Sequence, residues 1–169
     1  SQFRAAGMDP DHFPTTLEQL TADARKLDNI DSAGRYTRLG FLPGDLTRYA
    51  PAFGGGFYDP ASGQALLDTA QNLRALTYLA DTRRALGIDK VQRFDSGLKS
   101  TGGANWSFID GSFSIVLDGE WRVQQLAQYA PTLDYEVAPL PPPIGGKTLA
   151  SFVVPDHLTI PAGAKHAAG

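Results

Sequence analysis

The sequence predicts a fold of the α/β class, in which helices and strands alternate in packed layers. Apolar residues recur at helical spacing in three segments, which are 16–28, 62–86 and 119–129. Extended apolar segments lie between and after these helices, at 35–43, 112–117, 134–140 and 149–160. The same alternation also allows an α+β arrangement.

The composition is that of a folded protein. Of the 169 residues, 42% are apolar and 20% are charged, which is enough for one domain or for one lobe with part of another. The formal charge is -3 and no basic run is present, which argues against nucleic acid as a partner. The absence of cysteine excludes disulfides and thiolate metal sites. The first ten residues, SQFRAAGMDP, contain no signal-peptide pattern, and we expect the chain to be a fragment.

The first predicted helix spans about 16–28. Thr15 and Glu18 form a Thr-x-x-Glu capping box, so we expect Thr15 to cap the helix and Glu18 to return the hydrogen bond. Residues 45–60 are rich in glycine and aromatic side chains and predict a loop with one helical turn.

The longest predicted helix spans 62–86 and ends at Gly87. Its expected core face consists of apolar residues at helical spacing, which are Leu66, Leu67, Ala70, Leu73, Leu76, Leu79 and Ala80. Segment 89–108 has no sustained period and predicts short helices and loop.

A strand is predicted at 112–117 because apolar residues alternate there. Asp118 is then placed to cap a helix from 119 to about 129, which Pro131 ends. The proline run 141–143 predicts a stiff connector, because proline lacks the N–H that a central strand needs.

Several classes of site find no support in the sequence. The three histidines show no metal-ligand spacing, no G-x-S-x-G elbow is present, and PPPIGGKT lacks the first glycine of a phosphate loop. We therefore expect no cofactor, no metal and no catalytic residue. Asp118 and Glu120 could form the carboxylate pair of a glycan-acting enzyme, but neighbours two apart at a helix start point in different directions.

Trp121 is the strongest candidate for ligand binding. A flat indole beside free backbone N–H groups suits the C–H face and hydroxyl groups of a sugar. Its neighbours Asp118, Gly119, Glu120 and Arg122 offer acceptors and donors. The alternative is that Trp121 only seals the helix onto the core.

A second aromatic cluster surrounds a run of three glycines. It supplies the further candidate ligand-binding residues Tyr49, Phe53, Gly54 and Gly55, because a glycine loop can approach a ligand closely. The alternative for this cluster is a mobile surface loop.

Four stretches in the same order resemble family 1 extracellular solute-binding proteins of ABC importers, the group that includes maltose-binding proteins. They are FRAAGMDPDHFPTTLEQLTADARKL, FGGGFYDP with the long helix after it, FIDGSFSIVLDGEW, and DYEVAPLPPPIGG with LTIPAGAKHAA. In the third, Ser114 and Ile115 replace the Ala and Met of the family phrase.

The resemblance implies an incomplete two-lobed protein of the type II periplasmic-binding-protein fold, with a mixed sheet flanked by helices. Residues 1–142 would form the second lobe, and 143–169 would cross the hinge into a first lobe that the sequence lacks. We therefore expect 147–169 to pack poorly on the rest of the chain.

The same resemblance implies how the protein works. Trp121 would line a cleft between the lobes that captures a carbohydrate and delivers it to a membrane permease. The location would be periplasmic or extracellular, with a lipoprotein anchor possible in the full-length form. A non-sugar solute is the alternative ligand.

Overall fold

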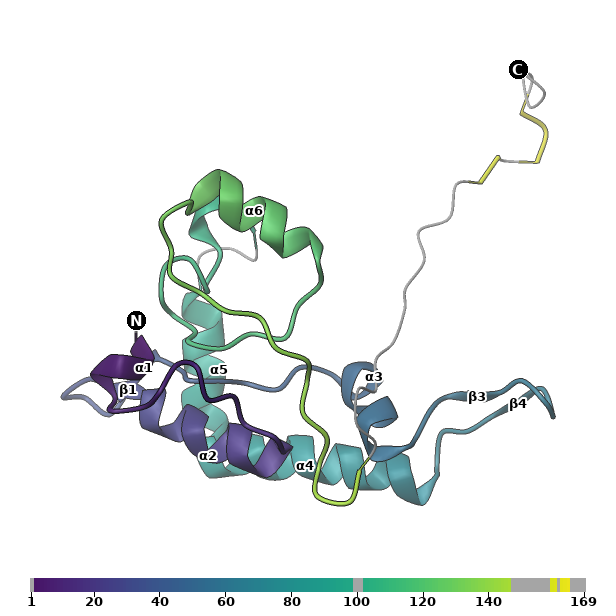
Figure 1. The fold of residues 1–169 in the computed structure, drawn as a ribbon. Coiled ribbons are helices and arrows are strands. Elements are labelled where there is room, and N and C mark those ends of the chain that lie inside the picture. The colour runs from purple at the N-terminus through teal and green to yellow at the C-terminus, as the bar shows by residue number, and fades with distance from the viewer. Residues whose placement is uncertain (1, 99–101, 147–158, 161, 165–169) are drawn as a thin grey trace.

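A computed structural model describes residues 2–98, 102–146, 159–160 and 162–164 (Figure 1). Its α-helices are α1 (Gln2–Ala5), α2 (Leu17–Leu27), α3 (Leu46–Tyr49), α4 (Ala70–Leu86), α5 (Ile88–Gly97) and α6 (Trp121–Tyr129). Short 3-10 helices are η1 (Ala50–Phe53) and η2 (Gly103–Asn105), and the strands are β1 (Asn29–Ile30), β2 (Tyr36–Arg38), β3 (Tyr58–Asp59) and β4 (Gln64–Ala65).

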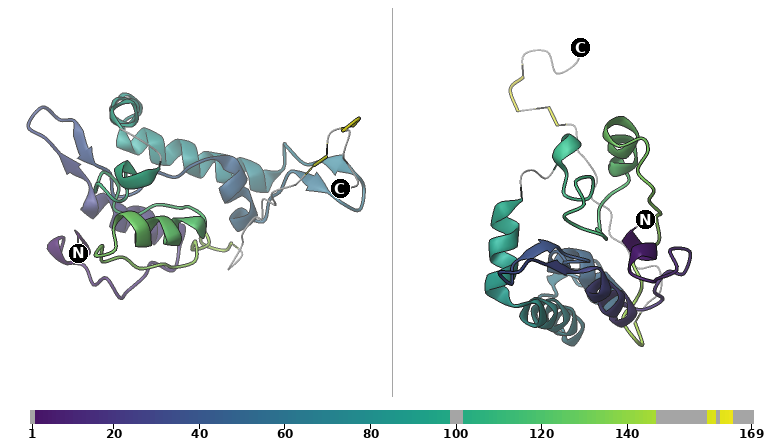
Figure 2. Two further views of the ribbon diagram at one scale, coloured as in Figure 1. Left: turned by 90° about the horizontal axis from the view of Figure 1, so that it is seen from above. Right: turned by 90° about the vertical axis from the view of Figure 1, so that its left-hand side faces the viewer.

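The helices form two levels. Helices α2 and α4 lie side by side with α5 at one end, and α6 lies above them (Figures 1 and 2). The β1–β2 and β3–β4 hairpins project from opposite ends of the molecule (Figure 2). The described residues thus form an α/β structure, in which loops connect the two levels of helices.

Pairing between strands is less extensive than the sequence predicts. Within the described residues the sheets are the antiparallel hairpins β1–β2 and β3–β4. Segment 112–117 is extended but makes a single parallel bridge, between Phe113 and Leu39, and 134–140 forms no strand. The expected mixed sheet is therefore absent from the described residues. The expected strand at 149–160 and the loose packing of 147–169 fall almost entirely outside them.

Helix α2 begins one residue later than the capping box predicts. The N-cap is Thr16, whose hydroxyl accepts a hydrogen bond from the Gln19 backbone N–H (3.2 Å), while Gln19 Oε1 accepts from the Thr15 backbone N–H (2.8 Å). The prediction that Thr15 caps the helix and Glu18 returns the bond is wrong, because Thr16 and Gln19 have the same spacing and the same chemistry.

Glu18 serves a different segment. Its carboxylate accepts a hydrogen bond from the Ile144 backbone N–H (3.1 Å), and the Pro142 carbonyl accepts one from the Leu17 N–H (2.9 Å). The proline connector therefore closes over the N-terminus of α2 and satisfies a helix N–H that has no intrahelical partner.

Helix α4 ends as predicted but begins later, and of its expected core face only Leu79 is buried. Gly87 is its C-cap, while Thr69 caps its start and 62–65 belongs to the β3–β4 hairpin. Leu73 and Leu76 are exposed. The buried residues lie on the face rotated away from them and are Asn72, Ala75, Leu79, Thr82 and Leu86.

The main core joins α2, α4 and the α3–η1 turn. Its buried members are Leu17, Leu20, Ala24, Phe41, Tyr49, Ala52, Phe53, Ala75 and Leu79. Gly40 lies so close to α2 that an added Cβ would overlap the Ala24 carbonyl, and Asp28 at the end of α2 accepts from the Gly40 N–H (2.7 Å). Helix α2 is thereby fixed against the segment that leads to α3.

None of the helices in the described part of the chain is long and apolar enough to cross a membrane.

The turn before α6 differs from its prediction in the N-cap and in the start of the helix, which is Trp121 rather than Gly119. The helix ends at Tyr129, before Pro131, as expected, but its N-cap is Glu120, which makes no side-chain capping bond. Asp118 is not the cap because its carboxylate pairs with Arg122 of the first helical turn (2.7 Å).

Candidate functional site

A cavity of about 400 Å³ opens between α3 and the start of α6. One wall comes from the turn into α3, the other from the turn into α6, and the extended segment before α6 forms the floor. The lining residues are Leu42, Gly44, Asp45, Arg48, Ser107, Phe113, Ile115, Val116, Leu117, Asp118, Trp121 and Arg122. Three of them, Asp118, Trp121 and Arg122, belong to the set that the sequence predicts.

Trp121 presents its indole at the edge of this cavity. Its exposed fraction is 57%, so the indole does not seal α6 onto the core. The ring packs against Gly119, where an added Cβ would overlap three atoms of the six-membered ring. The glycine therefore allows the indole to approach the backbone closely, which leaves most of the remaining ring surface open.

Asp118 and Arg122 form the charged part of the same wall. Arg122 Nε donates to Asp118 Oδ2 (2.7 Å), and each side chain is only 19% exposed. The guanidinium lies over the buried ring of Trp106 with 4.2 Å to the ring centroid, and it also donates to the Gln125 side-chain oxygen. The ion pair and the cation–π contact together fix the first turn of α6.

Asp45 and Arg48 form the charged part of the opposite wall. Asp45 is the N-cap of α3 and accepts from the Arg48 backbone N–H (3.3 Å), while the two side chains pair at 3.4 Å. Arg48 also donates to the Leu117 carbonyl (3.3 Å), which ties α3 to the floor. A hydrogen bond from the Thr47 hydroxyl, followed by the Arg48 contacts, lowers the pKa of Asp45, so this carboxylate is charged at neutral pH.

The other predicted residues do not line the cavity. Glu120 is exposed and is not one of the lining residues. Tyr49 is fully buried and Phe53 is 9% exposed, both within the main core. Gly54 and Gly55 close the η1 turn, where their N–H groups donate to the Pro51 and Ala50 carbonyls.

Asn72 explains how the glycine run packs against α4. Its buried side chain accepts from the Gly56 N–H (3.1 Å) and donates to the Gly56 carbonyl (2.7 Å) and the Leu66 carbonyl (2.6 Å). A Cβ at Gly55 would overlap the Asn72 side-chain oxygen. The glycine run thus packs around a buried amide of this chain.

Sequence reasoning missed Asp45 and Arg48. A local signal was present, since Asp45 follows Pro43-Gly44 and stands three residues before Arg48, which is the spacing of a helix cap and its first turn. What the pattern does not reveal is that α3 faces α6 across the cavity, because that depends on tertiary packing between segments some 70 residues apart.

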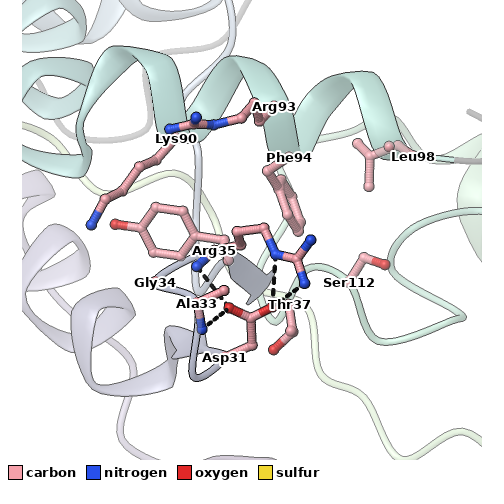
Figure 3. Close-up of a pocket in the computed structure, with 12 residues that line it drawn as sticks. Asp31, Ala33, Gly34, Arg35, Thr37, Lys90, Arg93, Phe94, Leu98 and Ser112 are labelled. Atoms are coloured by element: carbon pink, nitrogen blue, oxygen red, sulfur yellow. Dashed lines mark hydrogen bonds and ion pairs between the residues drawn. The ribbon is translucent and has the colours of Figure 1, made fainter.

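A larger cavity, of about 730 Å³, lies between the β1–β2 hairpin and α5 (Figure 3). Asp31 pairs there with Arg35 (2.8 Å), and hydrogen bonds from the Arg35 backbone and side chain lower the pKa of Asp31. Phe94 packs edge-on against Tyr36 at its base (6.5 Å between centroids). None of the predicted site residues lines this cavity, so we place the candidate site at α3 and α6.

The chemistry of the α3–α6 cavity is that of a polar-ligand site. It combines an open aromatic face with two carboxylates and two guanidinium groups, which accept and donate hydrogen bonds respectively. Among the described residues no cluster of three or more His, Asp or Glu side chains could hold a metal ion.

Comparison with known proteins was made at the levels of sequence and structure. No family model matches this chain, and no curated protein matches it. Two solved structures are similar, CpMnBP1 with mannobiose bound and CpMnBP1 with mannotriose bound, each with a TM-score of 0.78 and 29% sequence identity.

The two likenesses cover 88% of this chain, and 38% and 39% of the CpMnBP1 chains respectively. The chain thus spans about two fifths of the length of those proteins. In both fold and sequence, this chain is similar to part of a protein whose solved structures contain manno-oligosaccharides.

Proposed function

We propose that this chain binds a carbohydrate, as a lobe of the substrate-binding component of an ABC importer. The observation that carries the proposal is the likeness to CpMnBP1 over 88% of the chain, at a TM-score of 0.78 and 29% identity. A likeness in both fold and sequence supports related binding chemistry, whereas fold alone would not.

The α3–α6 cavity supplies the chemistry that such a ligand needs. The open indole of Trp121 stacks on the apolar C–H face of a sugar ring, and the charged groups on the two walls exchange hydrogen bonds with its hydroxyls. Asp118 and Arg122 act on the Trp121 side, and Gly119 sets the position of the indole.

The wider role follows from the family resemblance. In this proposal the chain has the type II periplasmic-binding fold, with residues 1–142 in the second lobe and 143–169 leading to the first. The two lobes close on the sugar and present it to a membrane permease. The site of action is periplasmic or extracellular.

A glycan-acting enzyme is less well supported by the geometry. Asp118 is held by Arg122, and Glu120 does not line the cavity, so the two carboxylates do not face each other across a bound sugar. Binding without catalysis is the function that the cavity supports best.

Titration with mannobiose and mannotriose tests the proposal, by calorimetry or by NMR where binding is weak. We expect Trp121→Ala to weaken binding by about 1 to 3 kcal/mol, because aromatic stacking and apolar burial are lost. Tyr129→Ala is the matched control, since Tyr129 is a 45% exposed aromatic residue at the far end of the same helix. Equal affinities for the wild type and Trp121→Ala would contradict the role of Trp121, and no saccharide binding by the folded chain would contradict the function.

A further inference from the structure

The charges that line the α3–α6 cavity balance. Its lining contains two carboxylates, Asp45 and Asp118, and two guanidinium groups, Arg48 and Arg122. Each wall holds one of each, and each pair is closed within its own wall, at 3.4 Å for Asp45–Arg48 and 2.7 Å for Asp118–Arg122. The cavity therefore has charged hydrogen-bonding groups without a net charge.

The two pairs differ in how accessible they are. Asp118 and Arg122 are each 19% exposed, and Arg122 is stacked on Trp106, so this pair is largely committed to holding α6. The Asp45 side chain is 60% exposed and that of Arg48 is 32% exposed. The α3 wall is the one whose charged atoms a ligand can reach most easily.

We propose that Asp45 and Arg48 form the second hydrogen-bonding wall of the site and that its paired charges select neutral rather than acidic saccharides. This inference rests on the proposed function and names its substrate class. A neutral sugar hydroxyl donates to the Asp45 carboxylate and accepts from the Arg48 guanidinium without disturbing their charge balance.

An acidic sugar meets a different situation. Any ligand carboxylate that approaches Arg48 or Arg122 also approaches the aspartate already paired with that arginine. Attraction to the arginine is therefore offset by repulsion from the aspartate, while the ligand carboxylate and the arginine both lose hydrating water. The site therefore offers an acidic saccharide little interaction energy to offset the cost of removing water from its carboxylate.

Asp45→Asn is the most informative variant because it changes the charge and keeps the fold. Asparagine is an equally good N-cap, so the bond from the Arg48 N–H that starts α3 can be retained. The matched control is Asp81→Asn on α4, which removes the acid of another exposed i,i+3 pair, Asp81–Arg84 (2.7 Å), away from the cavity.

The experiment measures affinity for mannotriose and for the corresponding mannuronate trisaccharide by NMR titration of the wild type and both variants. We expect the wild type to prefer mannotriose by about tenfold or more. In Asp45→Asn the affinity for mannotriose should fall about fivefold to tenfold and that for the acidic trisaccharide should rise, so that the preference shrinks or reverses. Asp81→Asn should leave both affinities unchanged.

Two results would overturn this inference while leaving carbohydrate binding intact. They are a wild type that binds both trisaccharides equally, and an Asp45→Asn variant that keeps the wild-type preference. If the folded wild type binds neither trisaccharide, the proposed function fails as well.

Discussion

Gly119 lies two residues before Trp121, and its lack of a side chain determines where the largest residue of the candidate site lies. The indole of Trp121 fills the volume in which a Cβ would stand. One part of the ring is therefore covered by backbone, and a ligand can stack only on the surface that faces away from Gly119. In the proposed binding mode, a residue with no functional group thus contributes through geometry.

We predict that Gly119→Ala weakens mannotriose binding about tenfold, since the new methyl group must push the indole aside and a small misplacement of a stacking ring removes most of its contact. Titration measures the effect, and circular dichroism checks the fold. Gly97→Ala is the control, because a Cβ at Gly97 meets only open space at the end of α5. Equal losses in both variants, or none in either, would contradict the positioning role.

Tyr49 illustrates a buried group whose titration affects stability. Burial, with a smaller contribution from Tyr78, raises the pKa of its phenol far above the ordinary value, and the hydroxyl makes no hydrogen bond within the described residues. The unfolded chain releases this proton near pH 10, whereas the folded chain retains it. Stability is therefore complete below about pH 10 and falls as the pH rises further.

Tyr49→Phe should accordingly change the free energy of unfolding little at pH 7 but make the protein more stable than the wild type above pH 10, by about 1 kcal/mol per pH unit. Urea denaturation at pH 7 and pH 11 measures the difference. Tyr58→Phe, at a 62% exposed position, should not produce it. An unchanged alkaline stability in Tyr49→Phe would show that other groups control the transition.

At the scale of elements, helix α4 shows how a hydrophobic pattern can predict a helix and misplace its buried face. Leu73 and Leu76 were expected in the core, yet they are 63% and 49% exposed. The buried amide of Asn72 fixes the rotation of the helix by its three hydrogen bonds of 3.1 Å or less to Gly56 and Leu66. An amphipathic pattern gives no weight to such a polar anchor.

Two leucines on α4 test this rotation. Leu79→Ala should lower the free energy of unfolding by about 2 to 4 kcal/mol, because Leu79 is 6% exposed in the main core. Leu76→Ala, at a half-exposed position, should cost less than about 1 kcal/mol. Urea denaturation of both variants compares them, and a larger loss for Leu76→Ala would mean that Leu76 lies in the core, as the sequence pattern predicts.

Local signals predicted the ends of helices better than the pairing of strands. The C-cap Gly87 and the stop before Pro131 could be predicted because each acts through its own backbone. The start of α2 was displaced by one residue because two threonines compete for the cap. The alternation at 112–117 predicts extended backbone correctly, but it carries no information about which strand lies beside it.

The sequence predicts one wall of the candidate site and not the other. The residues from Asp118 to Arg122 form one continuous stretch, so the aromatic and charged groups could be recognised together in the sequence. Asp45 and Arg48 reach the same cavity from another element, and the sequence offers no local signal for that meeting. Tyr49 and Phe53 stand in the same stretch but face the core.

At the scale of the whole molecule, the candidate site is an open cavity on a chain that spans about two fifths of the length of the CpMnBP1 chains. A sugar held by the walls of α3 and α6 alone keeps much of its surface in water. Affinity in a two-lobed site comes largely from enclosing the ligand between both lobes.

We therefore predict that this chain binds mannotriose far more weakly than a longer protein in which a second lobe faces the cavity. Titration of both proteins under the same conditions makes the comparison. Matching affinities would mean that the whole site lies within these 169 residues.

The two tryptophans of the chain stand in opposite surroundings. Trp106 is 4% exposed beneath the Arg122 guanidinium, whereas Trp121 is 57% exposed at the cavity. A dissolved quencher such as acrylamide can collide with the second indole and is largely excluded from the first. Emission from this protein should therefore divide into a protected and an accessible fraction. If a sugar stacks on Trp121 as we propose, it should transfer the accessible fraction to the protected one, and the chain would then report its own occupancy with no label and no second protein.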